Sequence, residues 1–144
     1  MKNKVNIAIR SIQGSLGEAP VDNQVVEMTV VGDLYEKHGH VYVVYDDNIL
    51  DPEHPVKTTI KLYDHKIDIK RYGGINHHLT FEADKTHHSH YETPFGILDI
   101  TVVTKTMLVD YNEDFLDINI KYELAVNDTS TGDAFFELRT SKIS

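Results

Sequence analysis

Alternation of apolar and polar side chains is the feature that most constrains how this chain folds. The clearest run covers residues 116–126, and shorter runs of the same period lie at residues 5–10, 60–63 and 66–70. Because successive side chains of a strand point to opposite faces, this pattern predicts β-strands with one buried and one exposed face. The many Val, Ile, Thr and Tyr residues in these runs agree with that prediction.

Turn-forming residues divide the chain into ten predicted strands with mostly short connections, such as 37–39, 73–74 and 127–133. The strands are expected over residues 3–13, 24–36, 40–46, 57–63, 66–72, 77–83, 86–93, 96–111, 115–127 and 134–142. Hairpin-length connections favour an all-β, antiparallel, largely up-and-down β-barrel of about 8–10 strands. A sandwich is the alternative, because residues 14–23 and 46–55 are long enough to cross over.

Length and composition indicate one domain over residues 1–144, without a repeat or a linker. The chain contains no cysteine, which excludes disulfides and zinc–thiolate sites and fits a reducing compartment. The N-terminal apolar run is interrupted by Asn6 and ends at Arg10, too early for a signal peptide. No window approaches the ~18 apolar residues that a membrane span needs. We therefore expect a cytoplasmic protein with no membrane partner.

Charge and motifs exclude several classes of function. The net charge of −9 disfavours nucleic acid as a partner, since phosphate backbones are also negative. The sequence has no P-loop, no dinucleotide-binding glycine motif and no G-x-S-x-G nucleophile motif. We therefore expect no cofactor and assign no catalytic residue, although an enzymatic activity is not excluded.

Two polar side chains fall on apolar faces. Arg71 shares its predicted face with Ile67 and Ile69, and Tyr122 lies within the apolar set of residues 116–126. An inward arginine is costly unless it is paired or hydrated. Arg71 therefore either lies at an open rim or binds an anion inside the barrel mouth. Lys61 alternates with Ile60, so its side chain is expected to lie outside.

The predicted strand 40–46 is apolar on both faces, with Val43 and Tyr45 on one and Tyr42 and Val44 on the other. Its outer face needs a cover, which the N-terminal segment or a partner subunit would supply. A homodimer is therefore possible, with Tyr42 or Tyr45 as the contact surface.

Nine histidines raise the question of a metal site. His88 and His90 share one face of their predicted strand. If strands 77–83 and 86–93 formed a hairpin, His77 or His78 would approach them, in an arrangement that suits Zn²⁺ or Ni²⁺. A solvated hairpin rich in histidine explains the same residues. We therefore expect no metal site, and His88 and His90 are the candidates that a metal titration would test.

Several short segments resemble the YwiB-like family, a group of small uncharacterised β-barrel proteins of low-GC Gram-positive bacteria. They are Thr58-Thr59-Ile60-Lys61, Arg71-x-Gly73, Phe81 and Tyr91-x-Thr93-Pro94-Phe95-Gly96, together with residues 41–45. The resemblance covers essentially the whole chain. It implies a lipocalin-like, or calycin, barrel with an internal cavity, and it implies no activity.

The resemblance adds Lys61 as a site residue, in conflict with alternation. A bulge within residues 56–62 would resolve the conflict, because a slip of one residue exchanges the two faces of a strand. Residues 91–96 also have a structural interpretation as a corner between strands, since Pro94 cannot donate to a ladder. The combined ligand-binding candidates are Arg71, Tyr91, Tyr122, Lys61, Thr59 and Thr93.

Three functions remain open at this point. The favoured one is a non-catalytic barrel that binds a small, partly apolar ligand, with Arg71, Tyr91 and Tyr122 around its anionic end. The second is an enzyme in the barrel mouth that uses Lys61, Arg71 and Tyr91. The third is a structural or interaction protein, since small barrels can be filled by side chains alone.

Overall fold

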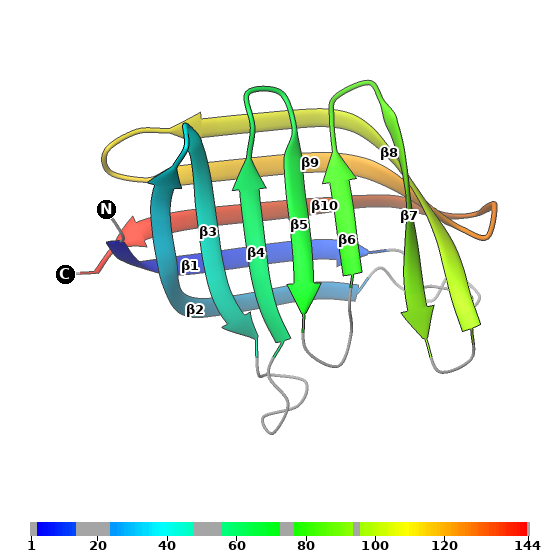
Figure 1. Ribbon diagram of the computed structural model, residues 1–144, viewed down its shortest axis with the longest axis horizontal. Coiled ribbons are helices and arrows are strands. Elements are labelled where there is room, and N and C mark those ends of the chain that lie inside the picture. The colour runs from blue at the N-terminus through cyan, green and yellow to red at the C-terminus, as the bar shows by residue number, and fades with distance from the viewer. Residues whose placement is uncertain (1–2, 14–23, 48–55, 73–76, 94–95, 144) are drawn as a thin grey trace.

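Within the described residues, the computed structural model of the protein consists of ten antiparallel strands (Figure 1). The structure describes residues 3–13, 24–47, 56–72, 77–93 and 96–143. The strands are β1 (Asn3–Gln13), β2 (Gln24–Lys37), β3 (His40–Asp47), β4 (Val56–Leu62), β5 (Ile67–Tyr72), β6 (His77–Phe81), β7 (Thr86–Thr93), β8 (Gly96–Tyr111), β9 (Leu116–Val126) and β10 (Thr129–Lys142). No helix able to span a membrane occurs in this part of the chain.

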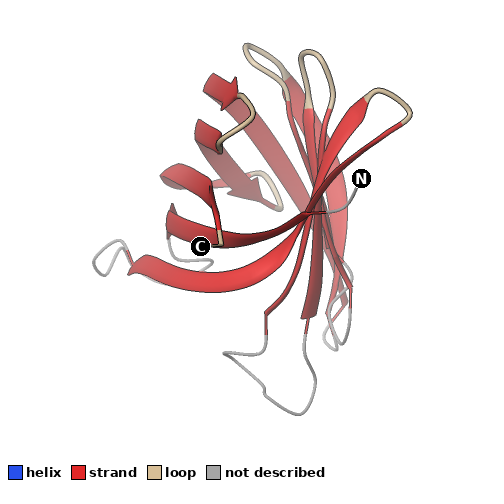
Figure 2. Cartoon of the chain, turned by 90° about the vertical axis from the view of Figure 1, so that its left-hand side faces the viewer, coloured by secondary structure: helices blue, strands red, loops and turns tan. Residues whose placement is uncertain are grey.

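The strands follow one another around the sheet in chain order. Their spatial order is β6-β5-β4-β3-β2-β1-β10-β9-β8-β7. The N-terminal strand β1 therefore pairs with the C-terminal strand β10. The two ends of the sheet, β6 and β7, lie side by side without forming a ladder. From the side, the sheet is seen to curl over so that its two layers face each other (Figure 2). The predicted antiparallel, up-and-down barrel is thereby confirmed, and it is nearly closed.

Strands 77–83 and 86–93 do not pair as the hairpin that a histidine metal site would require. β6 pairs with β5, whereas β7 pairs with β8 along the whole of β7. The turn between β6 and β7 is bonded to β8 instead: the backbone N–H of Asp84 donates to the carbonyl of Thr104, and the N–H of Thr104 donates to the carbonyl of Lys85. The longer ladder with β8 therefore determines where β7 lies. The barrel has its open seam between β6 and β7.

Gly32 lies where β2 changes its main partner. Residues Gln24–Leu34 pair with β1, and residues Asp33–Lys37 pair with β3. A Cβ atom at Gly32 would lie 2.5 Å from the carbonyl oxygen of Val44 and 2.6 Å from Cδ1 of Ile7. Only a glycine leaves room for this close approach as the sheet turns from one layer into the other.

The last hairpin is tighter than the sequence predicted. Asn127 and Asp128 both have positive φ, of 49° and 66°, as the central residues of a two-residue type I′ turn require. β10 therefore begins at Thr129 rather than at residue 134. Its ladder with β9 has one register shift, between Ser130 and Gly132. The predicted loop over residues 127–133 is mostly strand.

Inward-facing aliphatic residues of the strands form one core. Its most deeply buried members have no exposed surface and are Ile7, Val43, Ile60, Leu116, Ile118 and Leu138. A side chain with no exposed surface has no water-sized space against it, so this part of the interior is filled.

Candidate functional site

A row of polar side chains crosses the inner face of three neighbouring strands. Tyr45 of β3 is the ladder partner of Thr58 of β4, and Thr58 is the ladder partner of Arg71 of β5. Tyr45 and Thr58 are buried, and Arg71 is half-buried. The predicted inward direction of Arg71 therefore agrees with the register of β5. We call the end of the barrel that carries this row the Arg71 end.

The guanidinium of Arg71 is incompletely satisfied. Its Nε atom is buried and has no hydrogen-bond partner among the described residues. A buried donor without an acceptor typically costs about 1–3 kcal/mol, and more when the donor is charged. Ser89 of β7 has the same property, because its Oγ is buried without a partner in the described structure. Arg71 and Ser89 thus each have a buried polar atom for which the described residues supply no hydrogen-bond partner.

Inward residues of seven strands are slightly more exposed near the Arg71 end than in the middle of the barrel. The residues near that end are 4–8% exposed and those toward the middle are 0–1% exposed, whereas Val5 and Leu62 toward the opposite end are again 5–6% exposed. The first group comprises Ile9, Tyr45, Ile69, Leu79, Ile100, Leu124 and Phe136, and the second comprises Ile7, Val43, Ile67, Phe81, Val102, Ile120 and Leu138. The apolar residues near Arg71 therefore keep a small exposed surface, as residues near either end of the barrel do.

Tyr122 lies inside the barrel, as alternation predicted. Its side chain is 3% exposed, and its ring meets the ring of Phe81 edge-on at a centroid distance of 4.9 Å. Tyr91 and Thr93 belong to β7, where they pair with Leu98 and Gly96. The side chains of Tyr91 and Thr93 lie outside the described part of the structure, as do Gly73 and Pro94 altogether.

Lys61 and Thr59 lie on the outer face of β4, away from the interior. The ladders on both sides of β4 run without a register shift, so the bulge expected within residues 56–62 is absent and that prediction is wrong. The Nζ atom of Lys61 lies 4.6 Å from the ring centroid of Tyr63 and 5.4 Å from that of Tyr42. Hydrogen bonding to Tyr63, and then to Tyr42, raises the pKa of Lys61. Lys61 belongs to an outer aromatic surface and contributes nothing to an interior site.

The outer face of β3 is covered by its own neighbours. Tyr42 stacks on Tyr35 of β2 with ring centroids 5.1 Å apart, and Lys61 extends over its ring from β4. The expected cover by the N-terminal segment or by a partner is therefore not required for Tyr42. Tyr45 points inward and is excluded as an outer contact.

The described histidine side chains of β6 and β7, which exclude His77, contact separate partners. His88 contacts the hydroxyl of Thr101, and His90 contacts the carboxylate of Asp99. His78 lies 3.5 Å from Asp68 on the other side of the seam. Among the described residues no three His, Asp or Glu side chains form a group that could hold a metal ion. The proposed convergence of His77 or His78 on His88 and His90 depended on a hairpin that does not form.

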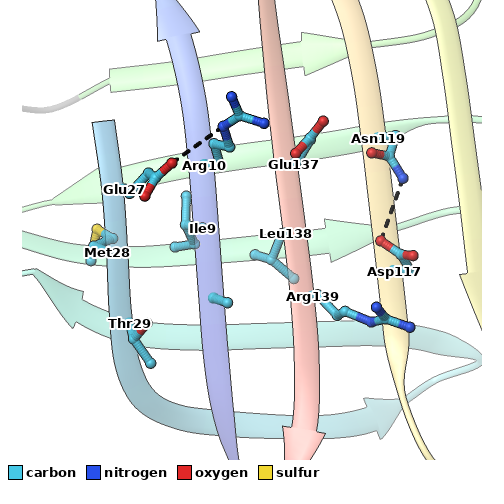
Figure 3. A pocket seen from close by; sticks show the side chains of 11 residues that line it. Ile9, Arg10, Glu27, Met28, Thr29, Asp117, Asn119, Glu137, Leu138 and Arg139 are labelled. Carbon is cyan, nitrogen blue, oxygen red and sulfur yellow. Dashed lines mark hydrogen bonds and ion pairs between the residues drawn. The ribbon is translucent and has the colours of Figure 1, made fainter. Parts of the chain in front are cut away.

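A concavity of about 550 Å³ lies on the outer face of β2, β1, β10 and β9 (Figure 3). It exists because Ala8 is short and stands between longer neighbours. Arg10 lies 3.4 Å from Glu27, and the amide of Asn119 donates to Asp117. Positive and negative side chains alternate across this depression and partly satisfy one another. It therefore lacks the buried, unpartnered donor that distinguishes the Arg71 end.

Comparison with known proteins places the chain in a family. Residues 7–138 match the family model described as a domain of unknown function, DUF1934. The chain belongs to the DUF1934 family. A curated relative, the uncharacterized beta-barrel protein YwiB of Bacillus subtilis (strain 168), is 27% identical over 110 residues, which are 74% of each protein. The predicted resemblance to the YwiB-like family is thereby confirmed.

A solved structure supports the same fold for this DUF1934 chain. The crystal structure of the ywiB protein from Bacillus subtilis superposes with a TM-score of 0.80 and 21% sequence identity, covering 99% of this chain and 94% of that one. At this identity the similarity establishes the barrel alone. The relative is uncharacterized, so the function of this DUF1934 chain has to be inferred from its own site.

Sequence reasoning did not single out Ser89, whose buried Oγ has no partner in the described structure. The signal was available, because Ser89 has the same alternation phase as Tyr91, which was selected. The partnerless state of Ser89 Oγ is a tertiary property that no sequence pattern reports.

Proposed function

We propose that the protein is a non-catalytic cytoplasmic barrel that binds a small, partly apolar, anionic ligand at the Arg71 end. The observation that supports this proposal is the inward Nε of Arg71, which is buried and without a partner among the described residues. A carboxylate, sulfonate or phosphate group accepts hydrogen bonds from a guanidinium in a geometry that matches its planar fork.

The surroundings of Arg71 suit the rest of such a ligand. Ile69 and Leu79 are the aliphatic neighbours on β5 and β6, and both retain some accessible surface. Thr58 lies directly across from Arg71 and offers a hydroxyl. Tyr122, Tyr91 and Thr93 remain proposed contacts, whereas Lys61 and Thr59 are left out because they lie on the outer face. Binding pockets commonly combine apolar walls with a few such polar groups.

The missing acceptor is the reason for proposing a bound anion. None of the described residues accepts a hydrogen bond from Nε of Arg71. A ligand that brings its own acceptor oxygens removes the penalty of the buried donor. Because charge-assisted hydrogen bonds contribute about 1.5–3 kcal/mol, Arg71 should improve the affinity for an anion by roughly 10- to 150-fold.

Two fluorescent probes that differ in charge test this assignment. One is 1-anilinonaphthalene-8-sulfonate, which is apolar with an anionic group, and the other is the neutral N-phenyl-1-naphthylamine. We expect both to bind the wild type, with the sulfonate at least about tenfold weaker in Arg71→Gln and the neutral probe unchanged. Arg139→Gln, an exposed arginine on the outer face of β10, is the matched control and should bind both probes as the wild type does.

Equal sulfonate binding by wild type and Arg71→Gln would contradict the proposal, as would a failure of either probe to bind the wild type. Native mass spectrometry of protein purified without denaturation adds a second measurement. A bare chain that takes up no dodecanoate would also count against the proposal.

A further inference from the structure

Within the described residues, the second half of β8 has a hydrogen-bonded strand on only one side, and Tyr111 at its end also donates to Glu36 of β2. β7 pairs with β8 as far as Val103, and the turn after β6 bonds to Thr104. From Thr106 to Tyr111 the ladder of β8 is with β9 alone in the described structure. Figure 1 shows this part of β8, in yellow, at the margin of its layer. We call residues Thr106–Tyr111 the free edge of β8.

The free edge is unusually apolar for an exposed strand. Leu108 is 68% exposed, Val109 is 46% exposed and Tyr111 is 42% exposed, and Met107 is partly buried. Natural sheets protect their edges with proline, with charged side chains that point inward, or with very short strands. The run Thr106-Met107-Leu108-Val109 has no proline and no charge of its own, although Lys105 and a register shift between Thr104 and Thr106 precede it. Its unpaired backbone groups and apolar side chains together fit the addition of another strand.

We propose that the free edge of β8 pairs with the same edge of a second copy of this chain, antiparallel and across a two-fold axis. Such an axis stands perpendicular to the sheet and keeps side chains on their own face, so a residue pairs with one of the same alternation phase. Centring the axis on Leu108 places Leu108 opposite its own counterpart. Met107 then faces Val109 of the second copy, and Thr106 faces Asp110.

The charged residues at the two ends of the free edge of β8 favour this antiparallel arrangement. Lys105 precedes the apolar residues and Asp110 follows them. Antiparallel pairing brings the lysine end of one copy to the aspartate end of the other, whereas parallel pairing would bring like charges together. Lys105 also holds Asp133 of its own chain, with Nζ 2.6 Å from Oδ1. Positive and negative charges thus both occur around the free edge of β8, although the whole chain has a net charge of −9.

A short ladder with three or four apolar side chains per copy is a small interface. We therefore expect weak association, with a dissociation constant on the order of 10 μM. Sedimentation velocity over a range of concentrations should show a wild type that shifts from monomer to dimer. Leu108→Lys places like charges directly opposite each other and should weaken dimerisation at least about tenfold. Val31→Lys, at another exposed valine on β2, is the matched control and should dimerise as the wild type does.

Cysteine crosslinking tests the register, because the chain has no cysteine of its own. Directly opposite residues of an antiparallel pair lie within the Cα distance that a disulfide bridges. Leu108→Cys should form a covalent dimer under mild oxidation, while Ile97→Cys, at the exposed other end of β8, should not. Thr106→Cys and Asp110→Cys should crosslink when mixed and much less when each is alone.

Three results would overturn the proposal. The first is a wild type that stays monomeric up to about 500 μM, well above the expected dissociation constant. The second is a Leu108→Lys variant that associates as strongly as the wild type. The third is an Ile97→Cys variant that crosslinks as fast as Leu108→Cys, which would show unspecific contact.

Discussion

Arg71 and Lys61 are cations of neighbouring strands with opposite environments. Lys61 keeps its ammonium in the solvent beside the rings of Tyr63 and Tyr42, where hydration and ring contacts both favour the charge. Arg71 points inward, and part of its guanidinium is dry and without a partner in the described structure. A guanidinium presents a planar fork of donors that matches the oxygens of a carboxylate or phosphate, which the ammonium of a lysine does not. The residue type at position 71 therefore suits the capture of an anion.

At the scale of single residues, we predict that Gly32→Ala destabilises the barrel. The new methyl group would lie 2.5 Å from the carbonyl oxygen of Val44, and backbone cannot move aside as a flexible side chain can. We expect a loss of about 2–3 kcal/mol in the free energy of unfolding, measured by urea denaturation. Thr29→Ala, at an exposed position of the same strand, should change it by less than about 0.5 kcal/mol. Similar losses in the two variants would show that Gly32 is not sterically required.

At the scale of elements, the turn between β6 and β7 holds the top of the seam. The backbone N–H of Glu82 donates to the hydroxyl of Thr104, and the Glu82 carboxylate lies 3.0 Å from Nε2 of His87. Lys85 Nζ lies 3.4 Å from the same carboxylate. Because no ladder joins the described parts of β6 and β7, these contacts fix their relative position at this point.

Because of this turn, we expect the stability of the folded protein to change with pH in the acidic range. Hydrogen bonding to His87, and then to Lys85, lowers the pKa of Glu82 below its usual value of 4.5. A carboxyl group whose pKa is lowered by folding stabilises the folded state at pH values above its unperturbed pKa. This stabilisation is lost as the pH falls through the lower pKa of the folded state. Glu82→Gln should therefore lower the melting temperature at pH 7 and cease to do so near pH 3. Glu113→Gln, in an exposed turn, is the control; if both variants behaved alike at all pH values, the role of this contact would be refuted.

At the scale of the whole molecule, the seam divides the barrel into strands paired on both sides and strands paired on one. β1, β9 and β10 each lie between two hydrogen-bonded neighbours, whereas β6 and β7 each have one. Backbone amides that face a missing neighbour are the first to open in local fluctuations. The barrel should therefore be most dynamic along one line beside the proposed ligand site.

Hydrogen exchange measures this division directly. We expect amides in β6 and β7 to exchange at least about tenfold faster than those in β1 and β10 under native conditions. The ligand of the Arg71 end should slow exchange in β5 and β6 while leaving β1 unchanged. Uniform protection across all strands would mean that the seam is closed in solution.

The sequence by itself determined the strands and their faces. Alternation is a local property, so it placed Arg71 and Tyr122 inside and Lys61 outside with no knowledge of the fold. Alternation was right at Lys61, and the wrong expectation of an inward Lys61 came from the family resemblance. Hairpin-length connections also predicted the meander, because neighbouring strands with short turns have few other ways to pair.

Tertiary structure alone decided which strands close the barrel and which groups remain unsatisfied. The pairing of β1 with β10 and the seam between β6 and β7 depend on strand length, on twist and on the bend at Gly32, which act over the whole sheet. Three features follow from that closure: the buried Nε of Arg71, the buried hydroxyl of Ser89 and the free edge of β8. A pattern with a period of two residues specifies which way each side chain points. What meets that side chain depends on strands far away in the sequence.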